Sequence, residues 1–130
     1  MSFETYMIGE EVTNLAADGD VTGFRIPIRI PYYRGVVLSL IEDFEVTVDG
    51  KRFPREAIRF SVRDKTLTLD EVAWDGQTRW EFGEWAALDV LDSGGLEPGE
   101  HDVEIVGQFR ISYLPWPMRP EASKRVQVAA

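Results

Sequence analysis

The sequence predicts an all-β protein whose short strands form an antiparallel β-sandwich or a jelly roll. Three observations lead to this fold class. Apolar and polar residues alternate over several short runs, turn signals recur every 8–12 residues or so, and helical periodicity is almost absent. A chain of 130 residues has the usual size of one domain. We therefore expect a single sandwich over residues 1–130 that contains at most one short helix.

The clearest strand runs from Gly23 to Pro31, and a second strand is expected at Val36–Ile41. On the first strand, one face carries Phe24, Ile26, Ile28 and Ile30, and the other carries Arg25, Pro27, Arg29 and Pro31. This period of two is typical of a half-buried strand. A proline has no N–H to donate to a neighbouring strand, so we expect this strand at an edge, or paired on one side only.

The remaining strands are expected at Met7–Leu15, Phe44–Gly50, Ile58–Arg63, Thr78–Leu91, His101–Leu114 and Arg125–Val128. Asp49-Gly50 predicts a tight hairpin turn, since this pair favours the positive φ angles that such turns need. Thr68 and Glu71 have the spacing of a capping box and predict one short helical turn. Gly83, inside an aromatic strand, predicts a bulge or a close approach of another backbone.

Composition excludes several classes of function. The net charge of −9 argues against nucleic-acid binding, which depends on basic surface. The chain has no cysteine, so disulfides and zinc–thiolate sites are excluded. The first residues lack the features of a secretory signal, and no apolar run reaches the roughly 18 residues that span a membrane. We expect a soluble, cytoplasmic protein.

Catalytic candidates are few. His101 is the only histidine, and it follows a Leu-Glu-Pro-Gly-Glu run similar to the corner before the penultimate strand of immunoglobulin-like domains. A structural role, with an imidazole N–H bonded to a nearby carbonyl, is favoured over a Ser-His-Asp role. One histidine also cannot form the multi-histidine metal centre of a cupin. An all-carboxylate Ca²⁺ or Mg²⁺ site stays open, although Asp18-Gly19-Asp20 is too short for a calcium loop. We therefore expect neither a catalytic residue nor a metal site in this chain.

A carboxylate pair provides one alternative. Glu81 and Glu84 flank Gly83 near Trp80 and Trp85, so they could form a glycosidase pair in an aromatic cleft. A solvated strand face is the favoured interpretation, with both tryptophans in the core.

Two aromatic and basic segments are the candidate surfaces for a partner or a pocket. The candidate residues are Tyr32, Tyr33 and Arg34 in the corner after the first strand, and Tyr113, Pro115, Trp116 and Arg119 in or beside the extended proline-rich segment 114–120. Tyr, Trp and Arg are enriched at interface hot spots, and stiff proline segments lose little entropy when they dock. The alternative is that both segments only cover the ends of the sandwich.

Several of these runs, taken in order, resemble the beta subunit of bacterial C-glycoside deglycosidases. The resemblance rests on Gly23-Phe24, Tyr32-Tyr33-Arg34-Gly35 with Leu38-Ser39, Val48-Asp49-Gly50, Trp80-Glu-Phe-Gly, Gly94-Gly95-Leu96 with Gly99-Glu100-His101, and Ser112-Tyr113 before the prolines. It implies a two-subunit carbon–carbon lyase. The α subunit would resemble a sugar-isomerase TIM barrel and hold a divalent metal, manganese, with the acid–base residues.

The resemblance also implies a substrate and a role. The substrate would be a 3-oxo-C-glycoside of an aromatic aglycone such as a flavonoid, and the products would be the aglycone and a dehydrated keto sugar. The chain would be a non-catalytic subunit that completes or covers the α-subunit pocket. The alternative from a different class is a stand-alone carbohydrate-binding sandwich, which would bind sugar as a monomer.

Overall fold

A computed structural model describes residues 7–30, 35–110 and 115–129. Its strands are β1 (Glu11–Ala17), β2 (Asp20–Ile28), β3 (Val36–Val37), β4 (Ile41–Val48), β5 (Lys51–Arg52), β6 (Ile58–Val62), β7 (Lys65–Thr68), β8 (Arg79–Trp80), β9 (Ala86–Leu91), β10 (Gly99–Phe109) and β11 (Glu121–Val128). The helical elements of these residues are short: 3-10 turns η1 (Leu38–Leu40) and η2 (Arg55–Ala57), and α2 (Leu69–Val72). The predicted all-β class with at most one short helix is confirmed. No helix within the described ranges has the length and apolar character needed to cross a membrane.

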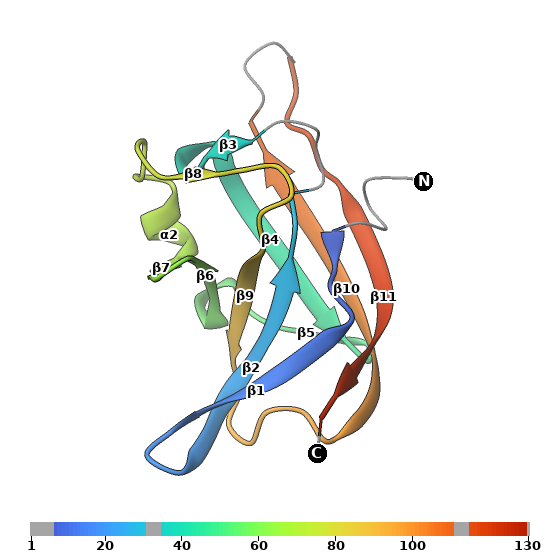
Figure 1. The fold of residues 1–130 in the computed structure, drawn as a ribbon. Helices are drawn as coiled ribbons and strands as arrows, with labels where there is room; N and C mark the ends of the chain where they lie inside the picture. Colours follow the sequence, from blue (N-terminus) through green and yellow to red (C-terminus); the bar gives the residue numbers. More distant parts are fainter. Residues whose placement is uncertain (1–6, 31–34, 111–114, 130) are drawn as a thin grey trace.

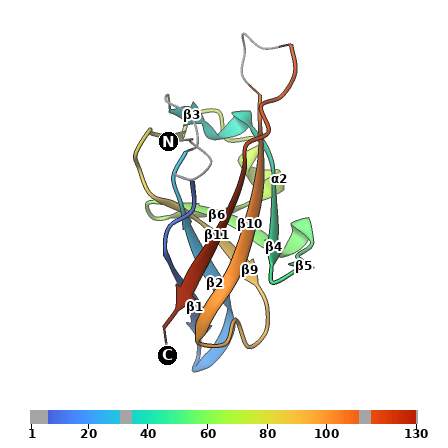
Figure 2. The same cartoon turned by 90° about the vertical axis from the view of Figure 1, so that its right-hand side faces the viewer.

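Nine strands form one curled sheet in the order β5-β4-β10-β11-β1-β2-β9-β6-β7, and β3 pairs with β8 in a small second sheet (Figure 1). Strand β1 joins the two halves of the large sheet. Its start pairs with β11 through Glu11 and Val12, and its remainder pairs with β2 from Thr13 onward. The β1–β11 pair is parallel and the other strand pairs are antiparallel, so the sheet is mixed. Seen from the side, the halves face each other as two layers (Figure 2).

The core lies between these layers. Phe44 of β4 stacks on Phe60 of β6, with ring centroids 6.1 Å apart, so the two halves are in direct contact. Phe60 also meets Trp80, and Phe44 meets Phe109, both edge to face. These rings are at most 1% exposed. Aromatic pairs in such geometries add to the free energy gained by burying their surface.

Strand β2 confirms the predicted alternation but not the predicted position. Phe24, Ile26 and Ile28 are fully buried, whereas Arg25 and Pro27 face outward. The edge position was wrong, because β2 pairs with β1 on one side and with β9 on the other. The sheet accommodates Pro27 because it lies opposite the point where β1 pairs with β11 instead of with β2. The Pro27 carbonyl accepts from Gly9 N–H at 2.9 Å, and the missing N–H of Pro27 is not required by a neighbouring strand there.

Local signals were mostly confirmed. Asp49 and Gly50 have φ angles of 50° and 83°, as the predicted hairpin turn requires, and Thr68 forms a capping box with Glu71 at the start of α2. The continuous strand over Thr78–Leu91 was wrong. It divides into β8 and β9 around a turn in which Gly83 has φ 83°, so this glycine reverses the chain and forms no bulge.

Candidate functional site

Four of the predicted site residues, Tyr32, Tyr33, Arg34 and Tyr113, lie outside the described residues. The other three, Pro115, Trp116 and Arg119, belong to the described part of the proline-rich segment. The residues flanking both segments lie at the same end of the sandwich, where β2 and β10 finish and β4 and β11 begin (Figure 1). We call this the β3–β8 end.

Trp116 is 65% exposed, as the sequence predicted. Its segment is anchored on the C-terminal side, because Met118 and Phe109 exchange two backbone hydrogen bonds of 2.8 Å. Arg119 then donates to Glu45 at 3.0 Å and to the amide oxygen of Gln108. An indole on a short, stiff segment with a fixed base loses little entropy on binding a partner.

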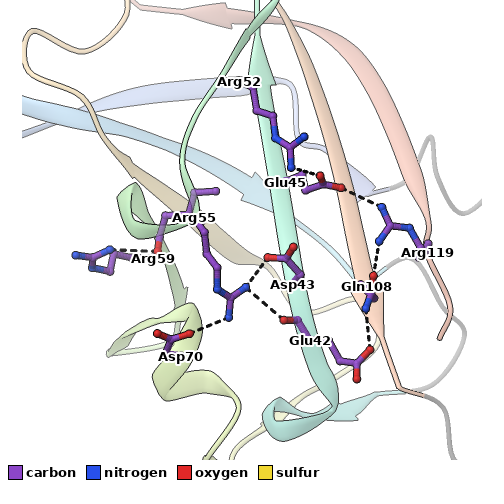
Figure 3. A network of polar contacts seen from close by, with 10 residues as sticks. Glu42, Asp43, Glu45, Arg52, Arg55, Arg59, Asp70, Gln108 and Arg119 are labelled. Atoms are coloured by element: carbon purple, nitrogen blue, oxygen red, sulfur yellow. Dashed lines mark hydrogen bonds and ion pairs between the residues drawn. The ribbon is translucent and has the colours of Figure 1, made fainter.

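Arg119 is one part of a charged network on the outer face of β4 and β10 (Figure 3). Its other members lie on β4 and on neighbouring elements. They are Glu42, Asp43, Glu45, Arg52, Arg55, Arg59, Asp70 and Gln108. Each arginine of the network has an oxygen acceptor within it or in the adjoining backbone, so this face satisfies its own charges. The sequence did not predict the network, because its members come from five separate stretches of the chain.

The turn between β8 and β9 lies beside both flanks of the Tyr32–Arg34 corner. On one flank, the guanidinium of Arg29 lies over the ring of Trp85, 4.3 Å from its centroid. On the other flank, Gly35 is so close to Trp80 and Glu81 that a Cβ there would lie 2.9 Å from the Trp80 carbonyl oxygen. This turn is thus close to the described residues on both sides of segment 31–34.

Trp85 corrects one sequence prediction. Trp80 is fully buried, as expected, but Trp85 is 49% exposed and is not a core residue. The reason is the break between β8 and β9: the turn changes which face the following residues occupy. The ring instead lies on the outer surface of β2, where a Cβ on Gly9 would meet it at 3.1 Å.

Trp85 forms one side of an open groove of about 580 Å³ on the outer face of β1 and β2, which we call the Trp85 groove. Its lining residues are Gly9, Glu10, Glu11, Thr13, Arg25, Pro27, Arg29, Trp85 and Lys124. Arg25 is fixed by a bidentate ion pair with Asp89, at 2.7 and 2.8 Å, and Lys124 donates to the Ile8 carbonyl at 3.1 Å. The alternation of Arg25, Pro27 and Arg29 in the sequence predicted the outward face of β2. The sequence did not predict that residues of β1 and β11, and Trp85, line the same groove.

The carboxylates Glu81 and Glu84 are both bound to arginines. Glu81 accepts from Arg79 at 2.8 Å, and Glu84 pairs with Arg63 and also accepts the Glu81 backbone N–H at 3.0 Å. Burial opposes ionisation of Glu84, but this N–H and the Arg63 guanidinium together hold its pKa below the usual range. A glycosidase acid needs a raised pKa, so this arrangement does not favour the glycosidase alternative.

His101 has the predicted structural contact. Its Nε2 lies 2.7 Å from the Glu97 carbonyl oxygen, and its Nδ1 lies 2.6 Å from Asp49 Oδ2. Asp49 also accepts the backbone N–H of Asp102 at 2.8 Å. The imidazole therefore ties the β4–β5 turn to the start of β10.

Metal-binding groups do not converge in the part of the chain that the structure describes: no three His, Cys, Asp or Glu side chains there lie close enough to hold an ion.

Fold and surface together define a class: an all-β protein with a self-paired charged face and exposed aromatic side chains at one end, the residue types enriched at protein interfaces. Comparison with known proteins gives the family. The family model "C-glycoside deglycosidase beta subunit" matches residues 3–113, and the chain belongs to this family.

Curated relatives agree with the family. A C-glycoside deglycosidase beta subunit from Eubacterium cellulosolvens is 36% identical over 98 residues, covering 75% of this chain and 67% of the relative. A 3'-dehydrocarminate deglycosidase beta subunit from Microbacterium sp. is 36% identical over 107 residues, covering 82% and 79%. A C-glycoside deglycosidase beta subunit from Arthrobacter globiformis is 30% identical over 109 residues, covering 78% and 80%. The chain is thus a subunit of a deglycosidase, and the designation "beta" implies an alpha-subunit partner.

Proposed function

We propose that this chain is the non-catalytic β subunit of a heteromeric enzyme that cleaves the C–C glycosidic bond of 3-oxo-C-glycosides. The observation that carries the proposal is the family match over residues 3–113. The name of one relative, which specifies a 3'-dehydro substrate, supports a sugar that is already oxidised at C3. The paired state of Glu81 and Glu84 supports a catalytic site on the partner.

The chemistry explains why the sugar must be oxidised first. A C-glycoside has no leaving oxygen to protonate, so the acid–base logic of O-glycosidases does not apply. A ketone at C3 acidifies the proton on C2. Removal of that proton gives an enolate with negative charge on the C3 oxygen. As the C3 carbonyl re-forms, the C1=C2 double bond forms, the C1–aryl bond breaks, and the aryl carbon takes up a proton. A divalent metal on the α subunit, manganese by family resemblance, would stabilise the negative charge that develops on the C3 oxygen.

The β subunit would complete or cover the α-subunit pocket from its β3–β8 end. Water exclusion strengthens the electrostatic stabilisation of an enolate and protects it from side reactions. We assign the contact to Trp116 and its neighbours Pro115 and Arg119, and to Tyr32, Tyr33, Arg34 and Tyr113. Exposure of Trp116 supports this, since a large indole left in water gains apolar burial when a partner covers it.

The first test is the mass in solution and the turnover of a 3-oxo-C-glycoside, measured for this chain, for a barrel-type α subunit from the same source, and for their mixture. We expect a stable heteromer that is active only as the mixture. A chain that stays monomeric and leaves α unchanged contradicts the proposal. Sugar binding by that monomer would then favour the carbohydrate-binding alternative.

A second test addresses the aromatic segment. Trp116→Ala should lower kcat/KM of the complex at least about tenfold, the loss expected for a hot-spot indole. Trp74→Ala is the matched control, because Trp74 is 90% exposed and lies after α2 outside the predicted segments. Equal kcat/KM of the two variants would contradict a place for Trp116 beside the pocket.

A further inference from the structure

The Trp85 groove differs from the outer face of β4 and β10 in what it exposes. The exposed large apolar side chains of the described residues are Trp74, Phe82, Trp85, Leu91 and Trp116, and none comes from β4, β5 or β10. Phe82 and Trp85 belong to the same turn beside the groove. The outer face of β4 and β10 instead carries the charged network of Figure 3. A partner on that face would have to remove water from paired ions, which the new contacts rarely repay.

Trp85 is held in place before anything binds. Its ring lies so close to Gly9 that a Cβ there would be 3.1 Å from it, the Arg29 guanidinium stacks on it, and about half of its surface stays exposed. A fixed, partly exposed indole gains apolar burial on association and loses few rotamers. This combination is typical of a hot-spot residue.

Charge in the groove indicates the chemistry of the occupant. Arg29 and Lys124 line it in a chain whose net charge is −9, while Glu10 and Glu11 line it from β1 and the residue before it. The groove would therefore fit a partner segment with two features: an apolar or aromatic side chain that packs on Trp85, and a neighbouring carboxylate that reaches the Lys124 ammonium. An open groove on a sheet face suits such a protein segment better than an enclosed small molecule.

We infer that the Trp85 groove binds a segment of the α subunit and is a main anchor of the heteromer. The inference rests on the proposed function, since it requires the α subunit as partner. It adds that the contact continues from the β3–β8 end along the outer face of β1 and β2. Arg29 supports this continuity, because it directly follows the end of β2 and stacks on Trp85.

The test measures the dissociation constant of the purified α and β subunits. Trp85→Ala should weaken the complex at least about tenfold. Leu91→Ala is the matched control: Leu91 is 47% exposed, nearly as much as Trp85, but lies at the opposite end of β9. The control should change the dissociation constant less than about twofold.

A second variant leaves the Trp85 packing intact. Thr13 is exposed and lines the groove, so Thr13→Arg should block the groove, with the same loss of affinity and an unchanged melting temperature. Unchanged affinity in both Trp85→Ala and Thr13→Arg overturns the inference. A raised KM at unchanged affinity also overturns it, because the groove would then border the substrate. If the wild-type subunits do not associate at all, the proposed function itself fails, and the two failures are thus distinguished.

Discussion

His101 shows at the scale of one residue how a lone titratable group is used for structure. The hydrogen bond to Asp49 raises the pKa of His101, against a smaller opposing effect of burial. The Asp102 backbone N–H, and then His101, lower the pKa of Asp49. Both shifts favour the charged pair, so its contribution to stability is complete between the unfolded-state pKa values of Asp49 and His101, about 3.9 and about 6.5.

The pair predicts a defined pH dependence of stability. The His101 contribution is complete below the unfolded-state pKa of about 6.5 and is lost as pH rises through the higher folded-state pKa. His101→Phe should therefore cost on the order of 1–2 kcal/mol at pH 6 and less at pH 9, measured by urea unfolding at each pH. Asp49→Asn keeps a turn-forming residue without the charge and should reduce the pH dependence similarly. A wild-type stability that is flat from pH 6 to 9 would contradict this.

Trp80 and Trp85 show what residue type alone leaves open. Both are tryptophans in one aromatic run, yet one is fully buried and the other half exposed. The indole of Trp80 donates to the Glu84 carbonyl at 2.9 Å, which helps close the turn that separates them. The sequence assigned both to the core because aromatic residues of a strand are more often core residues than surface ones, and it did not predict the turn at Gly83 that separates them.

At the scale of elements, the β4–β5 hairpin depends on one backbone conformation. Gly50 has φ 83°, and a Cβ added there would meet no atom within 4 Å. Gly50→Ala should thus cost about 1–2 kcal/mol from the left-handed conformation alone. Gly76→Ala is the control, since Gly76 has equally open space and no positive φ. Thermal unfolding of the two variants checks this, and equal melting temperatures would contradict it.

Strand β2 shows how an element can be predicted correctly and placed wrongly. Its alternation of buried and exposed side chains follows from the sequence, because side chains of a strand point to opposite faces in turn. Its central position does not follow, because Pro27 is tolerated only where β1 departs toward β11. That departure is a property of the pairing between distant strands.

At the scale of the molecule, β1 and the Phe44–Phe60 contact join the two halves into one core. We predict a single cooperative unfolding transition in which far-UV and near-UV circular dichroism coincide. Val12→Ala, at a fully buried position of β1, should lower the free energy of unfolding by on the order of 2 kcal/mol without separating the two signals. Ala16→Ser, at an exposed position of the same strand, should change little. Two separate transitions would show that the halves unfold independently.

The sequence by itself determined the all-β class, the hairpin at Asp49-Gly50, the capping box at Thr68, the structural place of His101 and the family. These depend on near neighbours or on motifs in fixed order, which a linear chain carries in full. Only the tertiary structure decided the exposure of Trp85, the central position of β2, the parallel β1–β11 pair and the charged network on β4 and β10. Each of these depends on which distant strands pair and which face they present, and a change of one residue in register reverses that face.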